Sequence, residues 1–313
     1  MELSSLVLKS DNLAVAKAIT IVENNDAQAK VLLKRLYPHT GHSFIIGVTG
    51  PTGTGKSTLV DGMISEYRKR GKTVGVLAVD PTSPFTGGAL LGDRIRMVKH
   101  NLDSAVFIRS MASRGDIGGL ATAARDAVRI LDASGKDIIV IETVGIGQTE
   151  SEIIRVADVT VVVLMPQLGD EIQALKAGIM ELGNIFVINK YDLEGADKAF
   201  YTLTSLITPR DGWRPPVIRT VAKSGRGINE VLEQLERFRK FRDGQPDRQK
   251  IYRDRLADEL LSTVKLELLN TLAGRVRENS EFWKLIDRMA SKKIDPHSAS
   301  KILIHHLVRS LTR

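Results

Sequence analysis

One segment of eight residues constrains the fold of this chain more than any other: Gly50-Pro-Thr-Gly-Thr-Gly55-Lys56-Ser57. It has the spacing G-x-x-x-x-G-K-S, follows an apolar run, and precedes a stretch with apolar residues at helical spacing. Glycines let the backbone wrap tightly, so that successive N–H groups point inward, and the next helix adds the positive end of its dipole. The segment therefore predicts a phosphate-binding loop between a strand and a helix.

Short apolar runs alternate with helical segments around this loop. The expected strands are 44–49, 73–80, 105–108, 137–142, 159–165, 184–189 and 216–221. The expected helices among them are 56–70, 118–133, 171–182 and 228–241. Several runs are apolar on both faces, which is typical of covered parallel strands. The pattern predicts an α/β fold, a P-loop NTPase domain over residues 43–242 with a mostly parallel, doubly wound sheet.

Helical extensions are expected on both sides of this domain. In residues 1–42, Val15, Ala18, Ile19 and Val22 recur at helical spacing. After a turn-rich break, residues 243–313 carry an apolar stripe at i+4 spacing, formed by Leu256, Leu260, Val264 and Leu268. This extension has more apolar face than a lone tail needs, so we expect it to pack on the domain or on a second subunit.

The net charge of +8 is confined to the C-terminal quarter. Residues 237–313 hold 18 Lys and Arg against 10 Asp and Glu. A solvated helical face explains this, and a docking surface for an acidic partner is the alternative. Aromatic residues make up only 5% of the chain, so nucleic acid is not an expected partner.

Composition also limits the compartment. The chain has no cysteine, no apolar run of the ~18 residues that a membrane span needs, and no signal-peptide pattern at its start. We therefore expect a cytoplasmic protein without disulfides and without a membrane partner. Six histidines with no cysteine form no convincing zinc or nickel cluster. His305 and His306 are interpreted as a surface or interface pair, and Asp295–Ser300 as the start of a helix.

A second motif, Asn189-Lys190-Tyr191-Asp192, follows the apolar run 184–189 and has the N-K-x-D spacing of GTPases. The Asp192 carboxylate can accept hydrogen bonds from guanine N1–H and N2–H₂, a donor pair that adenine lacks. Asn189 can donate to the N7 and O6 edge, and the stem of Lys190 can cover the base. A backbone N–H within Val221-Ala222-Lys223 is expected to meet guanine O6. The pair of motifs predicts GTP or GDP as the ligand.

Acidic residues that follow two of the expected strands point to Mg²⁺. Glu142 opens Glu142-Thr-Val-Gly145, in which the carboxylate can hold a magnesium-bound water and Gly145 N–H can meet the γ-phosphate. Asp80 ends another strand, and Asp93 follows in a loop; an ordinary cap or turn is the alternative for both. The candidate metal ligands are Ser57, Asp80, Asp93 and Glu142, and the candidate catalytic residues are Lys56, Asp80 and Asp93. The candidate nucleotide ligands are Gly50, Thr52, Gly53, Thr54, Gly55, Lys56, Ser57, Thr58, Gly145, Asn189, Lys190, Asp192, Val221, Ala222 and Lys223.

The residue after Gly145 bears on the rate. It is Ile146, not a glutamine that could orient the attacking water. The sequence therefore predicts slow intrinsic GTP hydrolysis, accelerated when a partner orders the segments near the γ-phosphate.

The motifs together resemble the MeaB/ArgK/MMAA family of SIMIBI-class GTPases. The resemblance is carried by the P-loop, Asp80–Ser83, Arg109–Gly115, Glu142–Glu150 and Asn189–Asp192, in that order. It implies a homodimeric chaperone of an adenosylcobalamin-dependent acyl-CoA mutase, most often methylmalonyl-CoA mutase, with cobalamin held only through the partner. The resemblance also implies that residues 167–176 form a third switch. The interior of the P-loop and Met165–Gly169 depart from the family pattern, which leaves open a related mutase.

Three other functions remain as alternatives. A nickel-insertion GTPase of the same class would carry Cys or His ligands near its switches. A kinase acting on amino-acid transport proteins would transfer phosphate to a protein instead of releasing it. A nucleotide-binding domain without hydrolysis would release no phosphate even with a partner.

Overall fold

The computed structural model describes residues 2–24, 27–80, 98–100, 102–112, 117–143, 155–166, 179–278 and 280–311. The chain divides into two compact units, Met1–Asp243 and Gly244–Arg313. The first unit contains the N-terminal helices and the α/β domain, and the second contains the C-terminal helices.

Seven parallel strands form one sheet in the order β3-β2-β4-β1-β5-β6-β7. They are β1 (Phe44–Thr49), β2 (Val74–Asp80), β3 (Val106–Ala112), β4 (Ile138–Thr143), β5 (Val159–Leu164), β6 (Ile185–Ile188) and β7 (Val217–Arg219). β1 lies at the centre, so the loop that follows it opens at the carboxyl edge of the sheet, between β4 and β5. The sheet confirms the predicted P-loop NTPase fold, with parallel strands and a doubly wound order.

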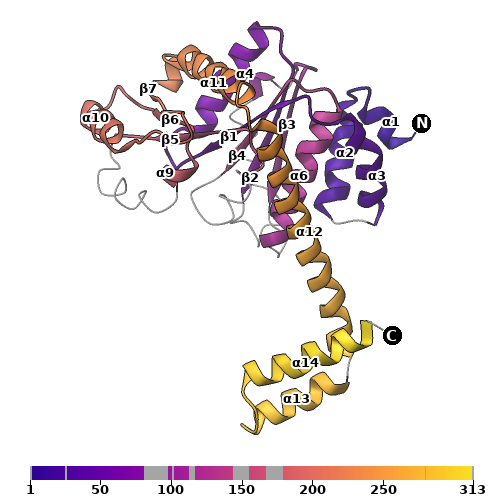
Figure 1. The fold of residues 1–313 in the computed structure, drawn as a ribbon. Coiled ribbons are helices and arrows are strands. Elements are labelled where there is room, and N and C mark those ends of the chain that lie inside the picture. Colours follow the sequence, from indigo (N-terminus) through magenta and orange to yellow (C-terminus); the bar gives the residue numbers. More distant parts are fainter. Residues whose placement is uncertain are drawn as a thin grey trace. The chain divides into compact units, whose positions relative to one another are not determined.

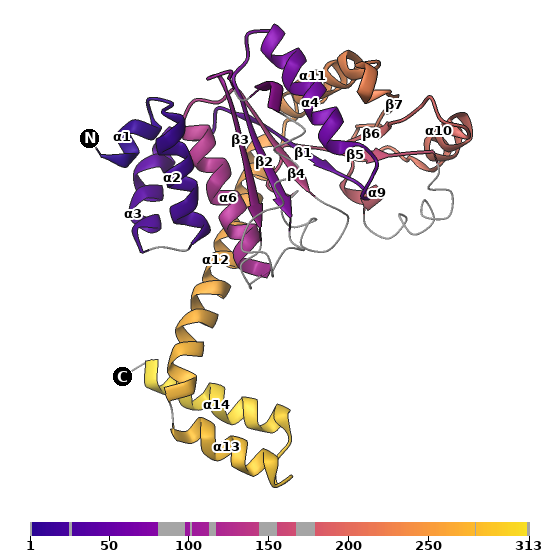
Figure 2. The ribbon, with the colours of Figure 1, turned by 180° about the vertical axis from the view of Figure 1, so that it is seen from behind.

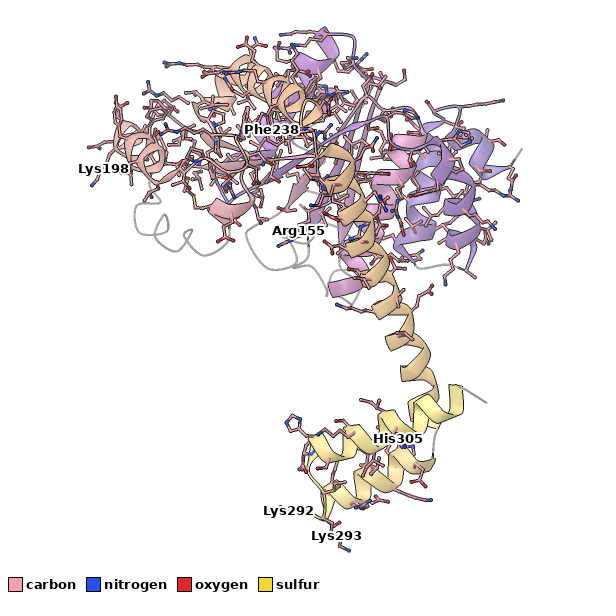
Figure 3. All side chains as sticks on the ribbon, in the orientation of Figure 1. Arg155, Lys198, Phe238, Lys292, Lys293 and His305 are labelled. Carbon is pink, nitrogen blue, oxygen red and sulfur yellow. The ribbon has the colours of Figure 1, made fainter. Side chains whose placement is uncertain are left out.

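Helices cover both faces of the sheet (Figure 1). α4 (Lys56–Lys69) and α11 (Ile228–Asp243) pack on one face, in a core that contains Tyr67 of α4 and Phe238 of α11. Phe238, labelled in Figure 3, also packs against Trp213, with 5.1 Å between the centroids of the two rings. α6 (Ile117–Ala133) packs on the other face. α10 (Ala196–Leu206) packs at the β6–β7 end of the sheet, and α9 (Ile179–Leu182) precedes β6. The described residues of this unit also form the single-turn 3₁₀ segments η1 (Tyr37–His39), η2 (Val98–His100) and η4 (Ala222–Ser224).

The N-terminal extension is helical, as its spacing predicted. α1 (Leu3–Val7), α2 (Asn12–Glu23) and α3 (Gln28–Leu36) pack beside α6 at the β3 end of the sheet, as Figure 2 shows from behind. The Asp11 carboxylate accepts a hydrogen bond from Ala14 N at 2.8 Å and so caps α2. Val15 and Ile19 of α2 are fully buried. The three helices therefore share one core with the sheet.

Three described elements differ from the prediction: β3 is longer, β7 is shorter than the expected 216–221, and α10 is additional. Of the expected helix 171–182, α9 is the described part, and 171–178 lie outside the described residues. β3 runs to Ala112, whereas the sequence indicated a strand that ended at Ile108. The polar pair Arg109-Ser110 hid the continuation, although Phe107 and Met111 are buried on either side of it. α10 was not predicted; its buried residues Ala199 and Leu203 have the i+4 spacing that could have indicated it.

The C-terminal unit consists of α12 (Arg248–Glu278), α13 (Ser280–Ala290) and α14 (Pro296–Leu311). Lys292 and Lys293, labelled in Figure 3, lie in the turn between α13 and α14. Asp295 accepts hydrogen bonds from the N–H groups of His297 and Ser298, which confirms the predicted helix start. In the parts of the chain that the structure describes, no helix has the length and apolar character of a membrane span.

Candidate nucleotide-binding site

The loop after β1 is shaped by glycines that no other residue could replace without strain. Gly50 has φ +147°, and a Cβ there would lie 2.1 Å from the Val163 carbonyl oxygen of β5. Gly55 has φ +90°, and its Cβ would lie 2.3 Å from Asn189 Nδ2. Gly53 has φ +82° and open space around it. The loop thus fits closely between β5 and the Asn189 loop, while its tip around Gly53 is exposed.

Lys56, the first residue of α4, folds back over this loop. Its Nζ donates to the carbonyl oxygens of Gly50 and Pro51 at 2.8 and 2.9 Å, and the residue is only 6% exposed. The Thr54 hydroxyl also donates to Pro51 O at 2.9 Å. The ammonium group is therefore held inside the ring of backbone that the motif predicts for phosphate, where it can turn to phosphate oxygens.

Ser57 and Glu142 are brought together, although 85 positions separate them in the sequence. The Ser57 hydroxyl donates to Glu142 Oε1 at 2.6 Å, and Glu142 is 2% exposed. Beside them, Thr143 Oγ1 donates to Thr49 Oγ1 at 3.0 Å. A serine hydroxyl and a buried carboxylate are oxygen ligands of the kind that Mg²⁺ prefers, so these residues fit the metal that the fold implies. Among the described residues, no cluster of three or more His, Asp or Glu could hold another metal ion.

Asp80 is the last residue of β2, the strand that pairs with both β3 and β4. Ala78, two residues before Asp80, pairs with Glu142, so the backbone of Asp80 lies at the same carboxyl edge of the sheet as the Ser57–Glu142 pair. Asp93, Gly145, Ile146 and the proposed third switch at 167–176 lie outside the described residues.

Asn189 joins three segments of the site. Its Nδ2 donates to Thr54 O at 2.8 Å, while its Oδ1 accepts from Ala222 N at 2.9 Å and from Thr220 Oγ1 at 3.0 Å. The side chain is buried, at 3% exposure. Asn189 therefore cross-links the phosphate loop to the segment after β7, a role that the base-contact interpretation of the sequence missed. Thr220 was missed too, because a lone threonine before Val221 carries no motif.

The rest of the N-K-x-D motif is open to a ligand. Lys190 adopts φ +55°, and its Nζ lies 3.8 Å from Met165 Sδ. Asp192 is exposed, and its carboxylate makes no hydrogen bond or ion pair within the described part of the chain. The Tyr191 hydroxyl donates to Asp197 Oδ1 at 2.6 Å, and burial together with this hydrogen bond raises the pKa of Tyr191. The contact of Asp192 with guanine stays a prediction, and the exposure of its carboxylate is compatible with it.

The hydrogen bonds of the segment after β7 leave one of its three candidate N–H groups available for guanine O6. Val221 N donates to Arg226 O at 3.0 Å, and Ala222 N donates to Asn189 Oδ1 at 2.9 Å. Of the three candidates, Lys223 in η4 has the N–H that bonds to nothing else in the described ranges. The contact to O6 is therefore expected from Lys223.

A phosphate loop after the central strand, a serine–carboxylate pair at the carboxyl edge and an N-K-x-D loop beside them define a P-loop GTPase. Residues 15–277 match the family model described as methylmalonyl Co-A mutase-associated GTPase MeaB. The chain belongs to the MeaB family of GTPases, as its motifs suggested, and it hydrolyses GTP.

Individual proteins agree with this assignment. A protein of Pyrococcus horikoshii that carries the name "putative GTPase" is 47% identical over 314 residues, which cover 98% of this chain and 98% of that protein. The mitochondrial methylmalonic aciduria type A homolog of Caenorhabditis elegans is 32% identical over 320 residues, which cover 95% of this chain and 80% of that protein. The crystal structure of an LAO/AO transport system kinase superposes with a TM-score of 0.73 over 97% of this chain and 96% of that one. Its sequence identity is 24%, so this likeness shows the fold alone.

Proposed function

We propose that this GTPase is a chaperone of an adenosylcobalamin-dependent acyl-CoA mutase of the methylmalonyl-CoA mutase type. GTP binding and hydrolysis gate cofactor loading and protection of that partner, and cobalamin is bound only through it. The observation that carries the proposal is the match of residues 15–277 to a family described as mutase-associated. The name of the relative from Caenorhabditis elegans supports the same partner. The protein is proposed to act in the cytoplasm.

The proposed roles follow the geometry of the site. Lys56 holds the β- and γ-phosphates, and Ser57 and Glu142 hold Mg²⁺, directly or through a water. Mg²⁺ neutralises charge on the phosphate oxygens. Asp80 and Asp93 complete the metal and catalytic set. The 2.6 Å contact between Ser57 and Glu142 supports this arrangement, because it places two oxygen ligands at one point beside the phosphate loop.

Hydrolysis by the isolated protein is proposed to be slow. Lys56 and Ser57 bind and orient phosphate and metal, and neither is a base for the attacking water. Ile146, where a water-orienting glutamine would help, supplies no such group either. A partner that orders the nearby segments would then set the rate.

The decisive experiment follows γ-labelled GTP with and without purified methylmalonyl-CoA mutase. We expect free phosphate at an unassisted rate well below roughly 10 s⁻¹ and a faster rate with the mutase. Lys56→Ala is the control, because it removes the phosphate contact and should abolish both rates. Label that stays on a protein would favour the transport kinase alternative, and a rate indifferent to the mutase would contradict the proposed partner.

A further inference from the structure

An arginine interrupts an apolar row in strand β3. Phe107 and Met111, two positions before and after Arg109, are 7% and 0% exposed in the core shared by α2, α6 and the sheet. Side chains two residues apart in a strand share a face, so Arg109 belongs to this row. A charged residue between two buried apolar ones breaks the pattern that folding alone favours, and such breaks concentrate where function demands them.

The partner of Arg109 lies on the N-terminal extension. Arg109 Nη2 contacts Glu23 Oε2 at 2.7 Å and Thr20 Oγ1 at 3.0 Å, both on α2. The Arg109 side chain is 18% exposed and the Glu23 side chain 7%. Glu23 is the last residue of α2, and its negative charge is unfavourable beside the negative end of the helix dipole. The last turn of α2 contains no basic residue that could compensate for this charge. Arg109 therefore provides the cation that this helix end needs.

The pair is not explained by stability. Removing two charges from water costs about as much as their attraction returns, and well-packed apolar residues often replace such a pair without loss. A buried ion pair can favour one position of the elements that it joins. Here Arg109 Nη2 bonds to both Glu23 and Thr20 of α2, while the buried Nε has no hydrogen-bond partner among the described residues.

The pairing of β3 with β2, and of β2 with β4, connects the Arg109–Glu23 contact to the nucleotide site. Among the described strands β3 lies at the edge of the sheet and pairs with β2, and Ala112 at its end pairs with Asp80. β2 pairs on its other side with β4, where Ala78 lies opposite Glu142, the partner of Ser57. An edge strand lacks a second neighbour to fix its end. The contact from α2 supplies that support on the strand next to Asp80.

We propose that the Arg109–Glu23 ion pair is a positioning contact for GTP hydrolysis: it holds β3 against α2 and thereby fixes the carboxyl end of β2 at Asp80. Neither residue touches nucleotide. Loosening the pair lowers the rate of hydrolysis and leaves GTP affinity unchanged, because the phosphate loop and the N-K-x-D loop lie on other strands. The inference rests on the GTPase activity of the chain and not on the identity of its partner.

The test uses the full-length protein without a partner, in single-turnover hydrolysis at saturating GTP and Mg²⁺. The variant is the double substitution Glu23→Leu with Arg109→Met, which replaces the pair with apolar residues. The control is Asp103→Asn, which removes the Arg68–Asp103 pair (2.7 Å) before the amino end of the same strand. The dissociation constant for GTP and the melting temperature are measured for each.

We expect the double variant to melt near the wild-type temperature and bind GTP unchanged, with hydrolysis slowed roughly threefold to thirtyfold. Asp103→Asn should lower the melting temperature and leave the hydrolysis rate intact. Arg109→Lys, which keeps the charge, should recover part of the rate. If the double variant does not fold, Glu23→Gln, which keeps shape and a hydrogen-bond acceptor, takes its place. Wild-type hydrolysis in the apolar variant, or an equal loss in Asp103→Asn, would overturn the proposal.

Discussion

At the residue scale, hydrogen bonds among side chains and between side chains and the backbone hold the nucleotide site together. Asn189 connects the phosphate loop to Ala222, and Ser57 is bonded to Glu142. Asp192, by contrast, is exposed and unbonded within the described residues. Within the same motif, Asn189 therefore stabilises the structure of the site, whereas Asp192 is available to bind the ligand. Mutations of the two residues should have different effects on stability and on nucleotide preference.

Asn189→Ala should weaken GTP and GDP binding together, roughly tenfold to a hundredfold, because it leaves Thr54 O and Ala222 N without their buried partner. The melting temperature should fall as well. Asp192→Ala is the matched change in the same loop: it should keep the melting temperature and lose the preference for GTP over ATP. Titration with fluorescent nucleotides measures both, and an unchanged affinity in Asn189→Ala would refute the cross-linking role.

Gly50→Ala should be costly in folding. Its Cβ would lie 2.1 Å from Val163 O, so β5 or the loop must move, at a cost of about 3 kcal/mol in unfolding free energy. Gly71 is the control, since it has φ +74° with no atom within 4 Å of an added Cβ. Gly71→Ala should cost only the conformational strain of about 1–2 kcal/mol. Urea denaturation compares them; equal losses would mean that strain, not the contact with β5, limits Gly50.

At the element scale, one buried lysine marks the entry to β4. Lys136 is 4% exposed, and its Nζ finds only Ala105 O at 3.5 Å among the described residues. Burial lowers the pKa of Lys136, and the charge of Arg68 adds to this effect. The folded state thus carries an ammonium group that is poorly solvated.

Lys136→Met should raise the free energy of unfolding at neutral pH by about 1 kcal/mol, because it keeps the stem and removes the buried charge. The folded-state pKa lies below that of the unfolded chain, so the penalty is complete below the folded pKa and disappears as pH rises toward the unfolded value. The gain should shrink over the same range. Lys72→Met, at a half-exposed ion pair, should change stability little. Thermal unfolding across alkaline pH tests this, and a gain that grows with pH would be the wrong sign.

Sequence reasoning succeeded where a signal was local. The phosphate loop, the strands that flank it and the parallel sheet follow from spacing and apolar runs. β3 was shortened at Ile108 because the polarity of Arg109 is compensated by Glu23, which is 86 positions away and invisible to a local pattern. The cross-linking role of Asn189 was missed for a similar reason: its bonds to Thr54 and Ala222 exist only once distant strands meet, and its predicted contact with the base stays a prediction.

At the scale of the whole molecule, the chain consists of two compact units. The C-terminal one leaves an apolar stripe on α12: Leu260, Leu261, Val264 and Leu268 are 65%, 58%, 44% and 51% exposed. Such a stripe is unusual for a helix that remains in water. We propose that a second copy of the chain covers it, as the family resemblance implies; packing on the α/β domain is the alternative that the sequence reasoning left open.

Leu260→Lys with Val264→Lys should therefore convert a dimer into a monomer, because two charges would have to be buried in the interface. Light scattering on the full-length protein measures the mass. Ser262→Lys, also exposed on α12 but on another face of the helix, should leave the mass unchanged. A wild-type protein that is monomeric at micromolar concentration would dismiss the dimer.

The central place of β1 has a consequence for synthesis on the ribosome. Both strands that border β1 come much later in the chain, at 138–143 and 159–164. The glycine loop has nothing to rest against until β5 has left the exit tunnel, so the nascent chain is expected to bind no nucleotide before about half of it has been translated. The apolar strand β1 remains unpaired until β4 and β5 have been translated. The nascent chain is therefore expected to be most prone to aggregation during this early part of translation.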